Sequence, residues 1–112
     1  MIYLASPYTS MLAEQREERF QAALRYTKFC MLRGETIFSP IVYGHNFSGD
    51  AAMIPFEPWQ TFNEEMIIRS TELRILCLPG WKDSRGVEAE IEFALRNGIR
   101  VKAVKDIPHE SV

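Results

Sequence analysis

The feature that most constrains this chain is the alternation of short apolar runs with longer stretches of helical periodicity. The apolar runs predict strands at residues 2–5, 35–40, 73–78 and 99–104. The periodic stretches predict helices at residues 11–33, 59–70 and 87–97. Strands that alternate with helices favour a parallel sheet with helices on both faces. With 112 residues, the chain is expected to form one domain over residues 1–112, too short for a (β/α)₈ barrel.

Two connecting stretches have their own character. Residues 41–58 carry Gly44, Gly49, Pro55 and Pro58 and are predicted to form one long loop. Loops this long in small domains tend to be functional. The last residues, 105–112, are predicted to be a surface tail or a segment that docks a partner.

Composition excludes several classes of function. Thirteen basic residues against fifteen acidic ones leave a net charge of −2, which gives no reason to expect a nucleic-acid partner. No apolar run approaches the ~20 residues of a membrane span, and the first residues lack the basic start of a signal peptide. Cys30 and Cys77 are too few for a disulfide framework. We therefore expect a cytoplasmic protein without a membrane partner.

Parallel sheets bind ligands at the carboxyl ends of their strands, where the strand order reverses. The residues that follow the predicted strands lie at 6–8, 39–41 and 79–81. Candidate binding residues in and after these segments are Ser6, Tyr8, Ser39, His45 and Trp81. The alternative interpretations are that Tyr8 packs against other aromatic side chains, that His45 has a structural role, and that Trp81 covers the hydrophobic core.

The segment from residue 78 to residue 94 carries the strongest signal, because a strand leads through a polar loop into a helix. Gly86 allows a ligand to approach the backbone at the helix start, where free N–H groups bind anions. Glu90 lies about 40° around the helix from Ala94, at the margin of the predicted core stripe. The alternative is that the acids of this helix only complement its dipole. Similarly, Ser84 is predicted either to cap the helix or to contact a phosphate.

Several common chemistries are not indicated. The chain has neither a G-x-x-x-x-G-K-[ST] nor a G-x-G-x-x-G motif, and no nucleophile elbow. His45 and His109 are the two histidines, and no Cys/His spacing is typical of zinc. No cofactor and no metal are therefore expected.

Two segments resemble the nucleoside 2-deoxyribosyltransferase superfamily, in particular its small bacterial and phage branches. The first is Tyr-Leu-Ala-Ser-Pro-Tyr at residues 3–8. The second is Ser-Arg-Gly-Val-Glu-Ala-Glu-Ile-Glu-Phe-Ala at residues 84–94. The resemblance implies a flavodoxin-like three-layer sandwich with a mostly parallel sheet of four or five strands. The order of the remaining elements agrees with this fold.

The resemblance also implies roles for individual residues. Glu90 corresponds to the nucleophile, which attacks the anomeric carbon of a nucleoside or nucleotide and forms a covalent intermediate as the base leaves. Tyr8 corresponds to a residue that contacts this glutamate, and Ser84 to a position beside the 5′ group of the sugar. Glu64, on the second long helix, is the candidate for handling the leaving base. Relatives complete their sites from a neighbouring subunit, so we expect a homodimer or a larger homo-oligomer.

The chain departs from the family pattern at two of these positions. Many members have aspartate where this sequence has Ser84 and Glu64. Serine removes a negative charge beside the 5′ position, and Lys82 and Arg85 add positive charge nearby. These differences favour a 5′-monophosphate over a free nucleoside.

The sequence thus predicts an N-glycosidase or base-exchange transferase that acts on nucleosides or nucleotides. Two alternatives belong to other classes, since a fold does not fix a function. One is a module of the same fold that binds a nucleotide without cleaving it. The other is an interaction protein whose acidic, aromatic surface docks a partner.

Overall fold

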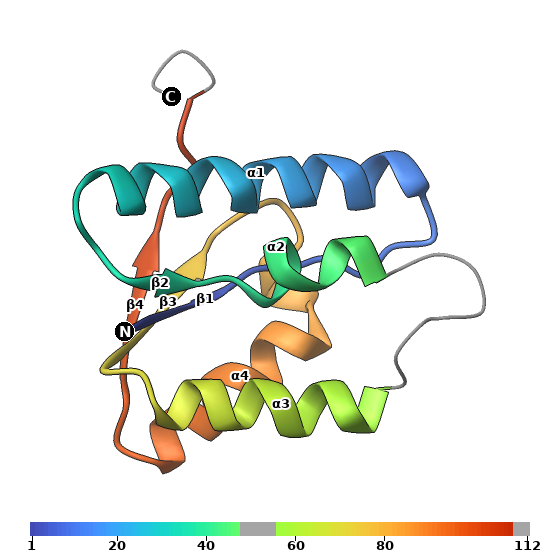
Figure 1. Cartoon of the computed structure of the whole chain (residues 1–112). Helices are drawn as coiled ribbons and strands as arrows, with labels where there is room; N and C mark the ends of the chain where they lie inside the picture. The colour runs from blue at the N-terminus through green and yellow to red at the C-terminus, as the bar shows by residue number, and fades with distance from the viewer. Residues whose placement is uncertain (48–55, 109–112) are drawn as a thin grey trace.

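The computed structural model describes residues 1–47 and 56–108, and these build a four-stranded sheet between layers of helices (Figure 1). The strands are β1 (Ile2–Ala5), β2 (Ile37–Phe38), β3 (Glu72–Leu76) and β4 (Arg100–Val104). All neighbouring pairs are parallel, in the order β2-β1-β3-β4. The predicted flavodoxin-like α/β fold is confirmed, with four strands. The strand order reverses between β1 and β3, at the centre of the sheet.

Helices cover both faces of the sheet. The long helix α1 (Ala13–Leu32) lies on one face, and α3 (Phe56–Ile68) and α4 (Arg85–Arg96) lie on the other (Figure 1). Short helical segments stand beyond the carboxyl ends of the strands. They are α2 (Pro40–Gly44) and the 3₁₀ helices η1 (His45–Phe47) and η3 (Trp81–Asp83). This arrangement leaves the carboxyl edge of the central strands ringed by helix starts and loops.

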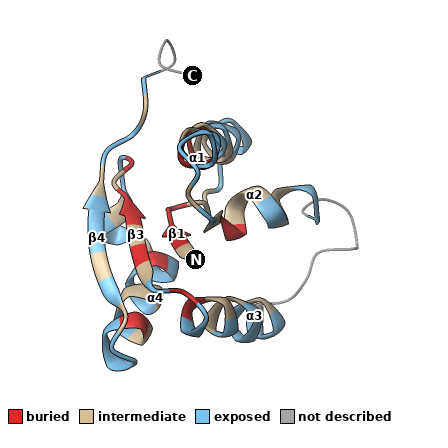
Figure 2. Ribbon diagram, turned by 60° about the vertical axis from the view of Figure 1, so that its left-hand side comes forward, coloured by how far each residue is buried: buried red, intermediate tan, exposed pale blue. Residues whose placement is uncertain are grey.

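Two hydrophobic clusters hold the layers together. Side chains of a strand alternate between its faces, so Tyr3 and Ala5 pack toward α3 and α4, whereas Leu4 packs toward α1. β3 follows the same rule, with Leu73 and Ile75 on the first face and Leu76 on the second. The central strands β1 and β3 are buried on both faces (Figure 2), as is typical of parallel sheets.

The stretch predicted as one long loop contains more regular structure than its composition indicates. α2 begins at Pro40, directly after Ser39, whose Oγ accepts a hydrogen bond from the Val42 N–H at 3.1 Å. Serine as N-cap followed by proline in the first turn is a favoured helix start, so this proline begins a helix. α3 begins at Phe56, three residues before the predicted start. Gly49 and Pro55 lie outside the described residues.

The predicted surface tail is anchored over its first residues. Arg25 of α1 donates from Nε to the Ile107 carbonyl at 3.2 Å, and its guanidinium forms an ion pair with Asp106. Ile107 packs against the hydrophobic cluster beneath α1. Residues 105–108 therefore close one end of the α1 layer.

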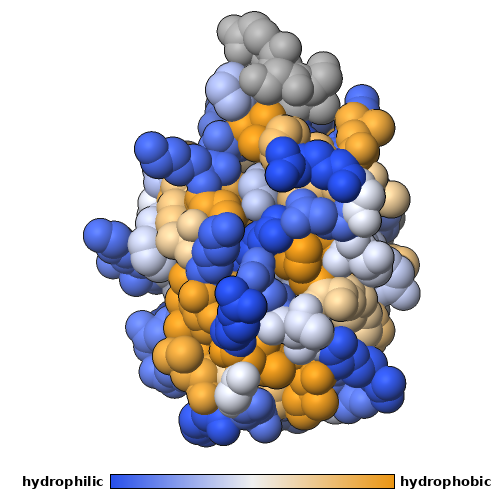
Figure 3. All heavy atoms as spheres, turned by 90° about the vertical axis from the view of Figure 1, so that its left-hand side faces the viewer, coloured by the Kyte–Doolittle hydropathy of each residue, from blue (hydrophilic) through white to orange (hydrophobic). Residues whose placement is uncertain are grey.

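Surface character agrees with the balanced composition. On the face seen in Figure 3, hydrophobic patches alternate with hydrophilic residues. Within residues 1–47 and 56–108, no helix combines the length and the apolar character needed to cross a membrane.

Candidate active site

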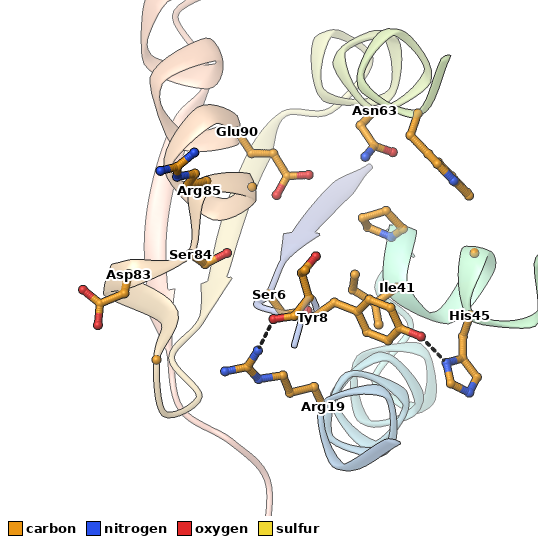
Figure 4. Close-up of a pocket in the computed structure, with 16 residues that line it drawn as sticks. Ser6, Tyr8, Arg19, Ile41, His45, Asn63, Asp83, Ser84, Arg85 and Glu90 are labelled. Carbon is orange, nitrogen blue, oxygen red and sulfur yellow. Dashed lines mark hydrogen bonds between the residues drawn. The ribbon is translucent and has the colours of Figure 1, made fainter. Parts of the chain in front are cut away.

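A cavity of about 670 Å³ lies at the carboxyl ends of the strands, at the reversal of the strand order (Figure 4). This is the position at which open α/β sheets bind ligands. Six of the nine residues predicted from the sequence line it. They are Ser6, Tyr8, His45, Ser84, Gly86 and Glu90.

Glu90 projects from α4 into this cavity, and the hydroxyl of Tyr3 donates a hydrogen bond to its Oε2. Burial raises the pKa of Glu90 to about 7, and the hydrogen bond from Tyr3 opposes part of that rise. Burial also raises the pKa of Tyr3 well above its usual value, with a further contribution from the Glu90 charge. Tyr3 therefore stays protonated, while Glu90 exchanges a proton near neutral pH. A titratable group perturbed in this way inside a cavity is typical of a functional site.

The predicted partner of Glu90 was the wrong tyrosine. Tyr8 lies beyond the end of β1, and its hydroxyl contacts Nδ1 of His45 at 2.8 Å. Tyr3 lies within the strand and faces α4, so its hydroxyl reaches the carboxylate. The signal was present in the sequence, because a tyrosine inside a buried strand needs a hydrogen-bond partner for its hydroxyl.

His45 is held on three sides. Besides the contact with Tyr8, its Nε2 lies 3.4 Å from Oε1 of Glu17 on α1. The Phe20 ring stacks on the imidazole with centroids 3.9 Å apart and planes 13° apart. This environment fixes the orientation of the ring at the cavity wall. The sequence did not indicate Glu17, since it lies on the exposed side of a long amphipathic helix.

Ser84 combines both of its predicted roles. Its Oγ accepts a hydrogen bond from the Val87 N–H at 3.2 Å and so caps α4, and the residue also lines the cavity. Gly86 follows in the first turn, also on the cavity wall. A β-carbon added there would meet only the Ser84 Oγ, at 3.9 Å, so the backbone of this turn faces open space. The helix start is therefore accessible to a ligand.

The remaining three predicted residues lie outside the large cavity. Ser39 is buried as the cap of α2, and Trp81 packs against the core with the Lys82 ammonium 5.7 Å from its ring centroid. Trp81 therefore covers the hydrophobic core, as the alternative interpretation of this residue expected. Glu64 lines a smaller adjoining cavity of about 140 Å³ that Glu90 also lines. Glu90 thus stands between the two cavities.

Further cavity residues were missed at the sequence level. Asn63 and Trp59, four positions apart on one face of α3, both line the cavity. The buried atoms Asn63 Oδ1 and Ser6 Oγ have no hydrogen-bond partner among the described residues. Buried polar atoms are normally paired, so these two are available to a ligand. Arg19 also lines the cavity, and its guanidinium donates to the carbonyls of Thr9 and Pro79.

Residues 1–47 and 56–108 contain no cluster of three or more His, Cys, Asp or Glu side chains with suitable geometry for a metal ion. His109 lies outside the described residues.

Comparison with known proteins places the chain in a family. Residues 1–106 match the family described as "Domain of unknown function (DUF1937)". The chain belongs to this family. A comparison with curated proteins finds no match. Because the family description assigns no activity, the function has to be inferred from the site itself.

Proposed function

We propose that this DUF1937 domain cleaves or exchanges the N-glycosidic bond of nucleosides or nucleotides, with Glu90 as the nucleophile. One observation carries the proposal: Glu90, hydrogen-bonded by Tyr3, stands in the wall of a large cavity at the reversal of the strand order. The resemblance of residues 3–8 and 84–94 to nucleoside 2-deoxyribosyltransferases supports the same assignment. Tyr3 takes the positioning role that the sequence assigned to Tyr8.

The geometry suits a two-step displacement. Tyr3 contacts Oε2, so Oε1 of Glu90 is the oxygen that attacks the anomeric carbon. The C–N bond breaks, its electron pair leaves with the base, and an ester joins Glu90 to the sugar. The positive charge that develops on the sugar is stabilised by the carboxylate. Water then releases the sugar, or a second base accepts it.

The protonation state of Glu90 sets a direction for the pH profile. A nucleophile must be ionised, and burial holds the pKa of Glu90 at about 7. Activity should therefore increase as the pH rises through 7. A glutamate that acted as a general acid would give the opposite slope.

Charged groups around the helix start support a 5′-monophosphate. Arg19 and Arg85 line the cavity together with Ser84, and α4 presents its amino end there. Asp83 adds one exposed carboxylate at the same place. The hydroxyl of Ser84 and the two guanidinium groups still favour an anionic substrate over a neutral one.

Glu64, the candidate for handling the leaving base, lines the small cavity that adjoins the large one at Glu90. We also propose a homodimer. Tyr43 and Phe62, stacked 5.6 Å apart next to the site, are 50% and 37% exposed and fit a contact with a second copy. Light scattering after size exclusion tests this assembly. The free thiols of Cys30 and Cys77 suit the reducing cytoplasm.

The test is an incubation with ribo- and deoxyribonucleosides and their 5′-monophosphates, with and without an acceptor base. Liquid chromatography measures the free base. The native protein should release or exchange base, and Glu90→Gln should lower the rate by about 10³-fold or more. Glu92→Gln, an exposed carboxylate on the same helix, is the matched control and should keep full activity.

A nucleotide-binding module is the second candidate. The unpartnered Ser6 and Asn63 oxygens are equally suited to hold a ligand that stays intact. Nucleotide binding in calorimetry, together with no base release from any substrate, would replace the enzymatic proposal by this one.

A further inference from the structure

We propose that Glu17, His45 and Tyr8 form an acid–base triad in which Tyr8 delivers the proton to the leaving base. This inference rests on the proposed function, because a triad of this kind needs a leaving group to protonate. It assigns chemistry to the cavity wall that faces Glu90. None of the three residues is needed by the nucleophile and its positioning partner Tyr3.

The three side chains make a continuous path. Tyr8 Oη lies 2.8 Å from His45 Nδ1, and His45 Nε2 lies 3.4 Å from Glu17 Oε1. The stacked Phe20 ring keeps the imidazole plane in place between its two partners. The path starts at the cavity and ends at solvent, because Tyr8 and His45 line the cavity and Glu17 is half exposed.

The arrangement has the logic of a carboxylate–histidine–hydroxyl triad. Glu17 orients the imidazole and balances its positive charge, and the imidazole exchanges a proton with the hydroxyl. In the protonated ring, Nε2–H faces Glu17 across the 3.4 Å ion-pair contact, and Nδ1–H donates to the Tyr8 oxygen. The Tyr8 O–H is then free to donate to a base in the cavity.

The protons balance over the two steps. As Glu90 bonds to the anomeric carbon, the C–N electron pair moves to the base and Tyr8 transfers its proton to the base nitrogen. His45 Nδ1 returns a proton to the Tyr8 oxygen and becomes neutral. In the second step water attacks the anomeric carbon, and the electron pair of the ester bond returns to Glu90. The proton lost by water passes to Tyr8, whose own proton restores the His45 imidazolium.

The position of the triad suits a general acid that acts opposite the nucleophile. Figure 4 shows Glu90 entering the cavity from α4, and Tyr8 and His45 on the opposite side. A nucleophile and an acid must approach a glycosidic bond from different sides. Glu64, the competing acid, lines the small adjoining cavity and has Gln60 Nε2 at 3.5 Å. Among the described residues, no histidine lies beside it to return its proton.

The deciding experiment compares two leaving groups on the same sugar phosphate. Guanine in 2′-deoxyguanosine 5′-monophosphate needs a proton to leave, whereas the N7-methylated base already carries a positive charge. Tyr8→Phe and His45→Gln should lower kcat/KM on the unmethylated nucleotide by about 10²- to 10⁴-fold, the usual contribution of a general acid. On the methylated nucleotide the loss should stay below about 10-fold, because no proton is then required.

The controls separate this inference from the proposed function. Glu90→Gln should lose activity on both nucleotides, and Glu92→Gln, which changes an exposed carboxylate outside the cavity, should lose none. Equal losses of Tyr8→Phe on both nucleotides would overturn the triad and leave the nucleophile intact. A large loss on the unmethylated nucleotide alone, seen in Glu64→Gln instead of Tyr8→Phe, would also overturn the triad. No cleavage of either nucleotide by the native protein would overturn the proposed function and the triad together.

A second measurement needs no substrate. Nitrogen-15 NMR of the native protein reports the tautomer of neutral His45. The triad requires the proton on Nε2, toward Glu17, and an unprotonated Nδ1 that accepts from Tyr8. Glu17→Gln should weaken this preference. A neutral ring that carries its proton on Nδ1 would contradict the proposed path.

Discussion

Two glutamates that contact the central strands have opposite surroundings. Glu35 accepts hydrogen bonds from the Arg74 guanidinium of β3, at 2.7 and 3.3 Å, and these lower its pKa. Glu90 accepts one hydrogen bond from the neutral Tyr3 hydroxyl of β1, and burial raises its pKa to about 7. Glu35 precedes β2 at the amino edge of the sheet, whereas Glu90 lies at the carboxyl edge.

The difference shows how one domain separates stability from chemistry. At the amino edge the charges compensate one another, since Arg74 also bonds to Glu72 and the Tyr26 hydroxyl. At the carboxyl edge the Glu90 carboxyl group lies in a cavity with one hydrogen bond and, among the described residues, no paired cation. The paired charges around Arg74 favour one folded arrangement. The unpaired carboxyl group of Glu90 keeps a pKa close to neutral pH, which suits a reactive group.

The largest effect should come from breaking the compensated cluster. Arg74→Met leaves Glu35 and Glu72 without their cation, and the free energy of unfolding should fall by about 3 kcal/mol. Arg69→Gln is the matched control, because it removes an exposed i,i+4 ion pair worth at most about 0.5 kcal/mol. Urea unfolding of both variants measures the contrast, and equal losses would show that Arg74 is not a stabilising centre.

Removing the charge of Glu90 should have the opposite effect and raise the free energy of unfolding at alkaline pH. The pKa of Glu90 is about 7 in the folded protein against an ordinary value of 4.5, so the folded state binds more protons between these pH values. Its contribution to stability is present below pH 4.5 and is lost as the pH rises through 7. Glu90→Gln should therefore raise the free energy of unfolding at pH 8 by about 1–3 kcal/mol relative to its effect at pH 4. Chemical unfolding at the two pH values tests this, and a pH-independent difference would contradict the raised pKa.

A smaller effect should follow from removing the partner of Glu90. Tyr3→Phe deletes the hydrogen bond that lowers the Glu90 pKa, so that pKa should rise further above 7. The ascending limb of the pH–activity profile should move to higher pH, with about a 10-fold loss of kcat/KM at pH 7. Recovery of most of the activity at pH 9 would separate this positioning role from a loss of structure.

The smallest effect concerns the phosphate. Arg19→Gln should raise KM for a 5′-monophosphate about 5- to 10-fold through the loss of one charge-assisted contact, and leave KM for the free nucleoside unchanged. Initial-rate kinetics with the two substrates measure the split. An equal rise for both would mean that Arg19 shapes the loop through its bonds to Thr9 and Pro79.

The sequence predicted the layers better than the details at the carboxyl edge. Strand positions, the parallel sheet and the place of Glu90 followed from periodicity, because local pattern decides them. The helix after Ser39 was missed because the proline was interpreted as the end of a strand rather than the first turn of α2. The Tyr3–Glu90 and Glu17–His45 contacts join residues 87 and 28 positions apart, and only the packed layers bring them together.

The bond between Tyr3 and Glu90 also bears on how ligands can be discovered. It joins β1 to α4, so a ligand in the cavity contacts segments from both ends of the chain. Such a ligand binds the folded form alone and adds about 2.7 kcal/mol of stability at 100 times its dissociation constant. In a domain of this size that corresponds to a rise of roughly 10 °C in the melting temperature. A thermal-shift screen of a metabolite library can therefore find the natural ligand before any reaction is assayed.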